Sequence, residues 1–266
     1  MIVHKAYTRY SEIDKEQLQK DIDAVKENIG VPTWEDFRHL LKLERWGRVL
    51  SICGYLMIAV LSYIEGSTEV LSTPLFWTMA FFAAIALGVG NVSRWANVAH
   101  PILHGAYDKV PNIPYRYTKA GFAKGIRRYV DWLDWIKPEA WAYEHNIMHH
   151  YHLGEKDDPD NIELNLRAIE KFPLWLKYLF VYLLAGTWKL TYYAPNTLRI
   201  LSNKENRKHN LKESNRLEYT PFTRNGYELW KNYVIPYALV RFVIIPSAFL
   251  PLGSEAVFNA FVITIA

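Results

Sequence analysis

The chain has 266 residues, of which 50% are hydrophobic and 15% aromatic, and its formal net charge at pH 7 is +4. This length suits one large domain or two small ones, and so small a charge gives no argument for nucleic-acid binding. The single cysteine, Cys53, excludes a disulfide framework and a metal site built from thiolates. Residues 1–17 contain no apolar stretch of the kind found in a secretory signal.

Two amphipathic helices are predicted before residue 46. In the first, over residues 11–29, apolar side chains recur at helical spacing, and Gly30 ends the helix. The second begins after Thr33, a residue type that caps helix N-termini, and an acidic residue follows three positions later. We therefore expect residues 1–45 to form a cytoplasmic or interfacial N-terminal region, and residues 46–266 to form a membrane-embedded domain.

Two apolar runs change the expected class of the protein. Trp46–Ile64 contains one charged residue and Thr73–Val92 contains none. Each run approaches the ~20 residues that cross a bilayer core of ~30 Å, so we favour a transmembrane hairpin over two buried helices of a soluble protein. Basic residues occur on both outer flanks, namely Arg38, Lys42, Arg45 and Arg48 before the hairpin and Arg94, Lys109, Arg116 and Lys119 after it. The turn between the runs has no Lys or Arg, so the positive-inside rule places both outer flanks in the cytoplasm.

The second run continues without a clear break to a first pair of histidines. A helix over residues 74–104 would be ~46 Å long, so its last turns would project beyond the apolar slab. Pro101 is expected to kink this helix near Asn97. Asn97, His100 and His104 have a spacing that places them on one helix face.

A second histidine cluster lies on another predicted helix, from Pro138 to His152. Its proline suits the first helical position, and Leu153-Gly154 would end it. Within a regular α-helix, His145, His149 and His152 line one face, whereas His150 is rotated by ~100° from His149. The adjacent histidines His149 and His150 could therefore bind different metal ions.

The remaining segments are assigned by composition. Aromatic and basic residues mix over residues 108–140, which favours an interfacial belt over a nucleic-acid stacking surface. Residues 172–194 form either a third span or an interfacial helix, and their lysines, Trp and Tyr favour the second. Residues 234–252 could form another span. Residues 256–266 begin a further apolar run that is too short to cross, so we expect the natural sequence to continue beyond it.

The two histidine clusters together predict a metal site. Six of the nine histidines lie in them, and histidine is the commonest metal ligand among side chains. The glutamate that follows the first histidine of a zinc protease motif is absent, because Pro101 follows His100 and Asn146 follows His145. At least five imidazoles exceed the four ligands of a zinc site and suit two first-row metals such as iron. The Glu-x-x-His pattern of soluble di-iron bundles is also absent.

Two histidine motifs carry a family resemblance. They are His100-x-x-x-His104 and His145-Asn-x-x-His149-His150, and Asp158-Pro159-Asp160 follows them. Together with the apolar runs, they resemble the first two histidine boxes of the integral-membrane fatty acid desaturase and hydroxylase superfamily. The resemblance covers residues 46–160 well and the remainder loosely. It implies an all-α integral membrane protein whose histidine-rich helices cover the cytoplasmic face.

The resemblance implies two iron ions that use O2 and external electrons to remove hydrogen from a lipid acyl chain, as in a desaturase. The ligands it implies are His100, His104, His145, His149 and His150. Helix geometry adds Asn97 and His152 as further candidates, and for His152 a role outside the metal site is equally open. Asp158 and Asp160 would orient ligands by hydrogen bonds, or would belong to a solvated turn.

The same resemblance suggests an electron donor and a membrane for this protein, and it leaves several alternative functions open. No haem-binding His-Pro-Gly-Gly motif precedes the first span, so a separate cytochrome or ferredoxin is the expected electron donor. The membrane would be the endoplasmic reticulum in a eukaryote or the inner membrane in a bacterium. No histidine follows His209, whereas the family carries a third box, so we expect missing ligands beyond Ala266 and no turnover without them. A lipid hydroxylase or ketolase, a zinc-dependent membrane lipid amidase and a scaffold without catalysis remain open.

Overall fold

The computed structural model describes residues 13–65, 74–132, 136–155, 158–161, 169–188, 192–219 and 223–265. Every regular element within these ranges is helical. Three helical stretches are long and apolar enough to cross a membrane: Trp34–Tyr63, Pro74–Leu103 and Arg224–Leu252. The predicted fold class, an all-helical membrane protein, is confirmed.

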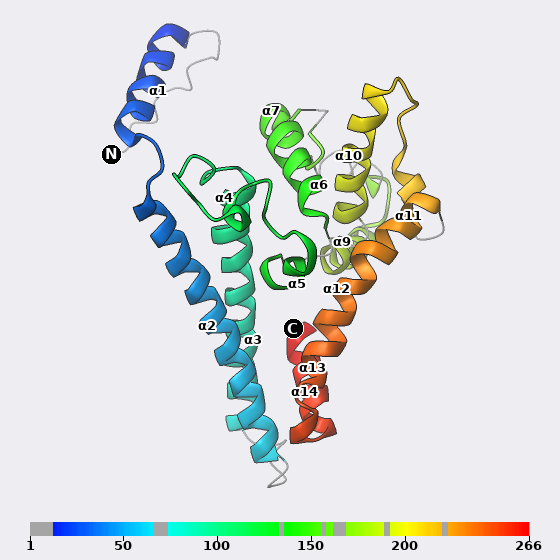
Figure 1. Cartoon of the computed structure of the whole chain (residues 1–266). Helices are drawn as coiled ribbons and strands as arrows, with labels where there is room; N and C mark the ends of the chain where they lie inside the picture. Colours follow the sequence, from blue (N-terminus) through cyan, green and yellow to red (C-terminus); the bar gives the residue numbers. More distant parts are fainter. Residues whose placement is uncertain are drawn as a thin grey trace, which may run out of the picture.

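The N-terminal helices form as their sequence predicts. Helix α1 (Lys15–Ile29) begins after Asp14, whose carboxylate accepts hydrogen bonds from the backbone N–H groups of Glu16 and Gln17. None of its residues is buried, and it projects away from the rest of the chain (Figure 1). Helix α2 (Trp34–Glu65) begins with a capping box, in which Thr33 N donates to Asp36 Oδ2 at 2.7 Å. Because α2 runs through residues 45 and 46, the predicted boundary there marks a change of composition inside one helix.

Helices α2 and α3 (Pro74–Ser93) form the predicted hairpin, and glycines bring the two helices close together. A Cβ placed on Gly90 would lie 2.8 Å from the backbone oxygen of Gly47 and 2.6 Å from Ser51 Oγ. Real Cβ atoms do not approach a backbone oxygen so closely, so the helices would have to separate. A Cβ on Gly88, two residues earlier on α3, would meet nothing within 4 Å.

Gly90→Ala is therefore expected to destabilise the hairpin by about 1–3 kcal/mol through overpacking. Gly88→Ala is the matched control, since both changes add the same methyl group and both gain roughly 1 kcal/mol of helix propensity. Thermal unfolding of the purified protein in detergent measures the difference. Equal unfolding midpoints for the two variants would contradict close packing at Gly90.

The C-terminal helices face the hairpin (Figure 1). They begin with one long stretch, made of α11 (Arg224–Leu229), η10 (Trp230–Val234), α12 (Ile235–Leu239), η11 (Val240–Ile244), α13 (Ile245–Ser247) and η12 (Leu250–Leu252). The two π-helical turns, η10 and η11, each end two residues before a proline, Pro236 or Pro246. Proline has no N–H for the usual helical bond, and the wider turn accommodates that loss.

Helix α14 (Ser254–Ile265) then returns along the hairpin. Asn259 Nδ2 donates to Ser62 Oγ of α2 at 3.5 Å, and the rings of Tyr55 and Phe249 lie 5.9 Å apart. Ile58, Ala83 and Ala260 are fully buried where these helices meet. The turn before α14 therefore lies at the same end of the molecule as the α2–α3 turn.

Two further helices lie between the second histidine cluster and the last candidate span. The described part of helix α9 (Leu174–Trp188) has 15 residues, ~22 Å of helix, and none of them is buried. Its interfacial placement stays a prediction. Helix α10 (Ala194–Lys208) is more polar and packs against the second histidine helix.

Candidate metal centre

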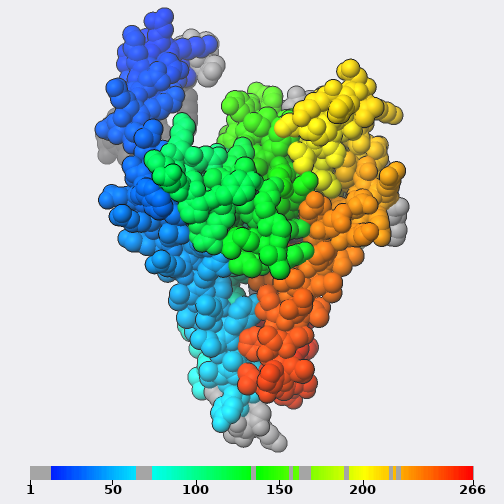
Figure 2. Space-filling model, in the orientation of Figure 1, coloured from blue at the N-terminus to red at the C-terminus, as the bar shows by residue number. Residues whose placement is uncertain are grey.

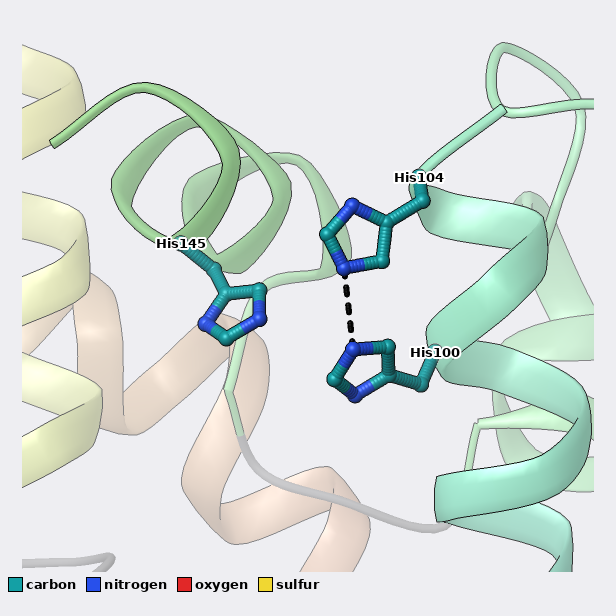
Figure 3. A group of neighbouring side chains, drawn as sticks. All are labelled: His100, His104 and His145. Carbon is teal, nitrogen blue, oxygen red and sulfur yellow. Dashed lines mark hydrogen bonds between the residues drawn. The ribbon is translucent and has the colours of Figure 1, made fainter. Parts of the chain in front are cut away.

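The first histidine pair lies at the end of α3. The helix continues through a π-turn, η3 (Arg94–Ala99), into the short α4 (His100–Leu103). His100 N donates to Trp95 O, five residues back, and Pro101 follows with no N–H to donate. A wider turn, which is itself a common site of helix kinks, thus lies where the kink was predicted near Asn97. His100 and His104 face each other, with 2.9 Å between their Nε2 atoms (Figure 3).

The second cluster lies on the helix predicted from Pro138 to His152. Its parts are α6 (Pro138–Tyr143), the π-turn η6 (Glu144–His149) and α7 (His150–His152). The turn joins His150 N to His145 O and contains no proline. It changes the helix phase, so that the Nε2 atoms of His145 and His150 lie 3.2 Å apart. The prediction of a regular α-helix, in which His150 is rotated by ~100° from His149 and lies off the face of His145, is therefore wrong at this turn.

The two helices bring their histidines together. The ring centroids of His100 and His145 lie 4.9 Å apart, and those of His104 and His150 lie 5.0 Å apart. His100, His104 and His145 each offer a ligand atom within 4.8 Å of the others (Figure 3). Asn146 Nδ2 donates to Leu103 O at 2.9 Å and so links the second helix directly to the end of the first.

A second group of possible ligands shares His145. His145, His149 and Asp160 also have ligand atoms within 4.8 Å of one another. His149 Nδ1 lies 2.9 Å from Asp158 Oδ1 and 3.8 Å from Asp160 Oδ2. Asp158 thus has the geometry of the hydrogen-bonding role predicted for it, whereas Asp160 lies close enough to be a ligand itself.

The two additional candidates make contacts of another kind. His152 Nδ1 lies 3.1 Å from Oε2 of the exposed Glu155. The exposed Asn97 donates from Nδ2 to Ser93 Oγ at 3.3 Å, back along its own helix. Both side chains therefore make other contacts, and His152 is not part of the two groups of possible ligands found among the described histidines and acids.

A tryptophan floor, which the sequence did not reveal as part of the site, closes the inner side of the cluster. It consists of Trp95, Trp132 and Trp141, whose rings are in mutual contact. Trp141 is fully buried, stacks on His145 at 4.4 Å and meets His100 edge-on at 5.2 Å. Its position four residues before His145 was the available signal, because that spacing places the two rings one above the other on a helix.

Burial favours the neutral form, which binds metals, for three of the imidazoles, those of His100, His104 and His145. Burial, followed by the charges of the neighbouring histidines, lowers the pKa of His145 to about 3. Burial and the neighbouring His100 and His150 also lower the pKa of His104. His145 Nδ1 is buried and has no hydrogen-bond partner among the described residues. Neutral imidazoles that converge on one another, with a buried ring nitrogen left unpaired, fit a bound cation.

Glu144 is a further residue of the site that the sequence analysis did not single out as functional. It is completely buried, and neither of its carboxyl oxygens has a hydrogen-bond partner within the described ranges. Burial, followed by the negative charges of Asp160 and Asp158, raises the pKa of Glu144 to about 9. Its side chain is therefore neutral at pH 7.

This charge state has a testable consequence for metal-free protein. The folded state holds the Glu144 proton where the unfolded state, with a pKa near 4.5, has released it. Stability therefore falls as the pH rises from about 4.5 to 9. Glu144→Gln is expected to flatten this dependence between pH 6.5 and 9, above the range in which His145 titrates. Thermal unfolding across that range measures it, with Glu139→Gln, which alters the ion pair with Lys124, as the control.

The same pH dependence in wild type and Glu144→Gln would contradict a buried, neutral Glu144. A loss of folding in Glu144→Gln would contradict it as well, because glutamine reproduces the shape of a protonated glutamate.

Three candidate membrane spans and an imidazole-lined site at the end of one of them define a helical membrane protein with a candidate metal centre. The pattern of one protein family, described as Fatty acid desaturase, matches residues 75–266, well over half of the chain. The chain belongs to the fatty acid desaturase family. No curated protein and no solved structure matches it.

Proposed function

We propose that this protein is a membrane di-iron oxidoreductase that introduces a double bond into a lipid acyl chain. The carrying observation is the meeting of five imidazoles from two helices at the end of a candidate span, in a chain of the desaturase family. Side chains alone do not remove hydrogen from an unactivated carbon, so the reaction requires a metal cofactor and O2.

Five of the histidines would bind iron in this proposal. His100, His104, His145 and His150 would hold one iron, and His149 would contribute to a second iron beside Asp160. Bound iron supplies the activation of O2. The chain's own residues orient the ligands: Asp158 accepts a hydrogen bond from His149, and Asn146 keeps the two helices in register. The tryptophan floor shields the inner side of the cluster from water.

Topology supports the expected partners. The histidine helices and the basic flanks lie at the end of α2 and α3 opposite their turn, which favours the cytoplasmic side under the positive-inside rule (Figure 1). A lipid chain would reach the site from the bilayer, and a separate cytochrome or ferredoxin would deliver electrons from the cytoplasm.

The test combines metal analysis with lipid profiling. Protein purified under anaerobic conditions is expected to contain iron, and cells that express the full-length natural protein are expected to gain unsaturated acyl chains only in the presence of O2. Stoichiometric zinc without iron would oppose the proposal and favour the lipid amidase. Hydroxylated or oxo products without new double bonds would assign the protein to the hydroxylases or ketolases.

A further inference from the structure

Helix α1 carries an apolar stripe that nothing in the described part of the chain covers. Leu18, Ile22, Val25 and Ile29 form the stripe, and each of these side chains is between 40% and 76% exposed. Figure 2 shows the helix, in dark blue, as a projection that stands apart from the histidine region. An isolated helix of 15 residues is marginally stable in water, so an exposed apolar stripe on it indicates a partner.

The position and charge of α1 argue against lipid as that partner. Helix α2 has 32 residues, ~48 Å, so with Glu65 at one edge of a ~30 Å hydrocarbon core Trp34 lies ~18 Å beyond the other edge. The headgroup layer accounts for only ~5–8 Å of that distance, and α1 lies farther out still (Figure 1). Helix α1 also has four acidic residues and three lysines, whereas helices that bind lipid surfaces carry an excess of basic residues. The stripe is therefore expected to face protein.

The stripe has the spacing of a coiled coil. Its residues are four, three and four positions apart, which places Ile22 and Ile29 at heptad position a and Leu18 and Val25 at position d. A β-branched residue at a with leucine at d favours two parallel strands, and Val25 is the one departure from that pattern. Lys15 occupies the preceding a position, where a single polar residue sets the register of a dimer.

The charges beside the stripe are complementary to a second copy of the same helix. Asp21 occupies position g and Lys26 the following position e, and in a parallel pair these two positions face each other across the helices. Each Asp21 would therefore meet the partner's Lys26, twice by symmetry. Within its own chain Asp21 accepts from Gln17 at 2.8 Å, and Lys26 lies 3.5 Å from Asp23. Both contacts are exposed and contribute little, so they leave the two charges available.

We propose that α1 pairs with α1 of a second copy of this chain in a parallel, two-stranded coiled coil on the histidine side of the membrane. Two copies in one bilayer are related by a two-fold axis along its normal, so their α1 helices leave the membrane on the same side and run parallel. Anchoring both copies raises their effective concentration, which allows so short a coiled coil to form. This role does not depend on iron or on the lipid reaction.

Disulfide cross-linking of the full chain in cell membranes tests the pairing. Leu18→Cys is placed in a Cys53→Ser background, which removes the single native cysteine, and is expected to give a linked dimer of twice the 31.1 kDa chain mass. The d positions of a parallel pair face each other, within reach of a disulfide. Lys20→Cys is the matched control, because position f points away from the partner, and it is expected to cross-link about tenfold less.

Exchange of the two charges tests the register. Asp21→Lys faces two lysines with the partner's Lys26, and Lys26→Asp faces two acids with each other, so each variant is expected to weaken its own dimer. The two variants are co-expressed with different tags, each also carrying Leu18→Cys. Mixed dimers regain both opposite-charge pairs, so they are expected to exceed either homodimer about tenfold.

The outcomes distinguish a paired α1 from other partners. Equal cross-linking of Leu18→Cys and Lys20→Cys overturns the proposal, because it indicates random collision. Absence of cross-linking in both variants overturns it as well and leaves the stripe to a different protein. Mixed dimers at only twice the amount of each homodimer, the random proportion, contradict the pairing of Asp21 with the partner's Lys26. No residue of α1 is buried, so these substitutions leave the folding of the membrane domain unaffected.

Discussion

His145→Ala is expected to lower both bound iron and desaturated product at least about 100-fold, because removing a residue that only orients a ligand already costs 10–100-fold in metal sites. His145 is the one histidine common to both groups of possible ligands. Its ring contacts those of His100, His104, His149 and His150. Its loss would therefore affect both metal positions at once.

The control is His152→Ala, the same substitution seven residues, or nearly two turns, further along the same helix. His152 contacts Glu155, which is exposed, and its replacement is expected to leave iron content and product near the wild-type values. Metal analysis of the purified variants and lipid profiles of the expressing cells measure both quantities. A large loss of iron in His152→Ala would indicate that His152 is a ligand, as a regular α-helix predicts. It would contradict the inference that the π-turn takes His152 away from the metal.

The helices themselves could be predicted, because each depends on local signals. Composition and length identified both helices of the hairpin. Thr33, Gly30 and Pro138 marked helix ends that the structure shows at the same residues or one residue away. Apolar runs of membrane length leave few alternatives to a helix, since backbone polar groups in lipid must bond within their own segment. These features required no knowledge of tertiary contacts.

The arrangement of the second histidine cluster could not be predicted in the same way. Pro101 gave a signal for irregular geometry in the first histidine helix, but η6 contains no proline and its widened turn left no mark in the sequence. A single π-turn moves every later side chain by most of one residue's rotation, which brings His150 to His145 and takes His152 away. The sequence analysis therefore selected the right cluster of histidines but assumed the wrong helix phase for it.

Residues that act through tertiary contact were also beyond local reasoning. Trp141 and Glu144 are completely buried beside the histidines. Trp141 contacts His100 of the first histidine helix, and Glu144 lies near Asp158 and Asp160, so both depend on residues outside their own helix. Such residues become visible once packing places two distant segments together.

Asp158→Asn is expected to reduce iron content and product about 10–100-fold, the range typical of a residue that orients a metal ligand. Burial alone would raise the pKa of Asp158, but hydrogen bonds from His149, Gly154 N and Asp160 N outweigh it and lower that pKa below its usual value. The carboxylate is thus ionised at pH 7 and accepts every one of these bonds. An asparagine has one accepting oxygen, so its NH2 group must face a donor.

The contact between Asp158 and His149 explains why this loss would reach the metal. Asp158 Oδ1 lies 2.9 Å from His149 Nδ1 and favours a proton on that nitrogen. In the metal-binding form of the imidazole, this arrangement directs Nε2 to the cation. The matched control is Glu155→Gln, which changes an exposed carboxylate–histidine pair, that of Glu155 and His152, and is expected to have no effect. If Asp158→Asn kept wild-type iron and activity, His149 would not need a fixed tautomer and its assignment as a ligand would fail. If instead only the second iron were lost, with half the metal retained, the division of His149 and His150 between two metal positions would be supported directly.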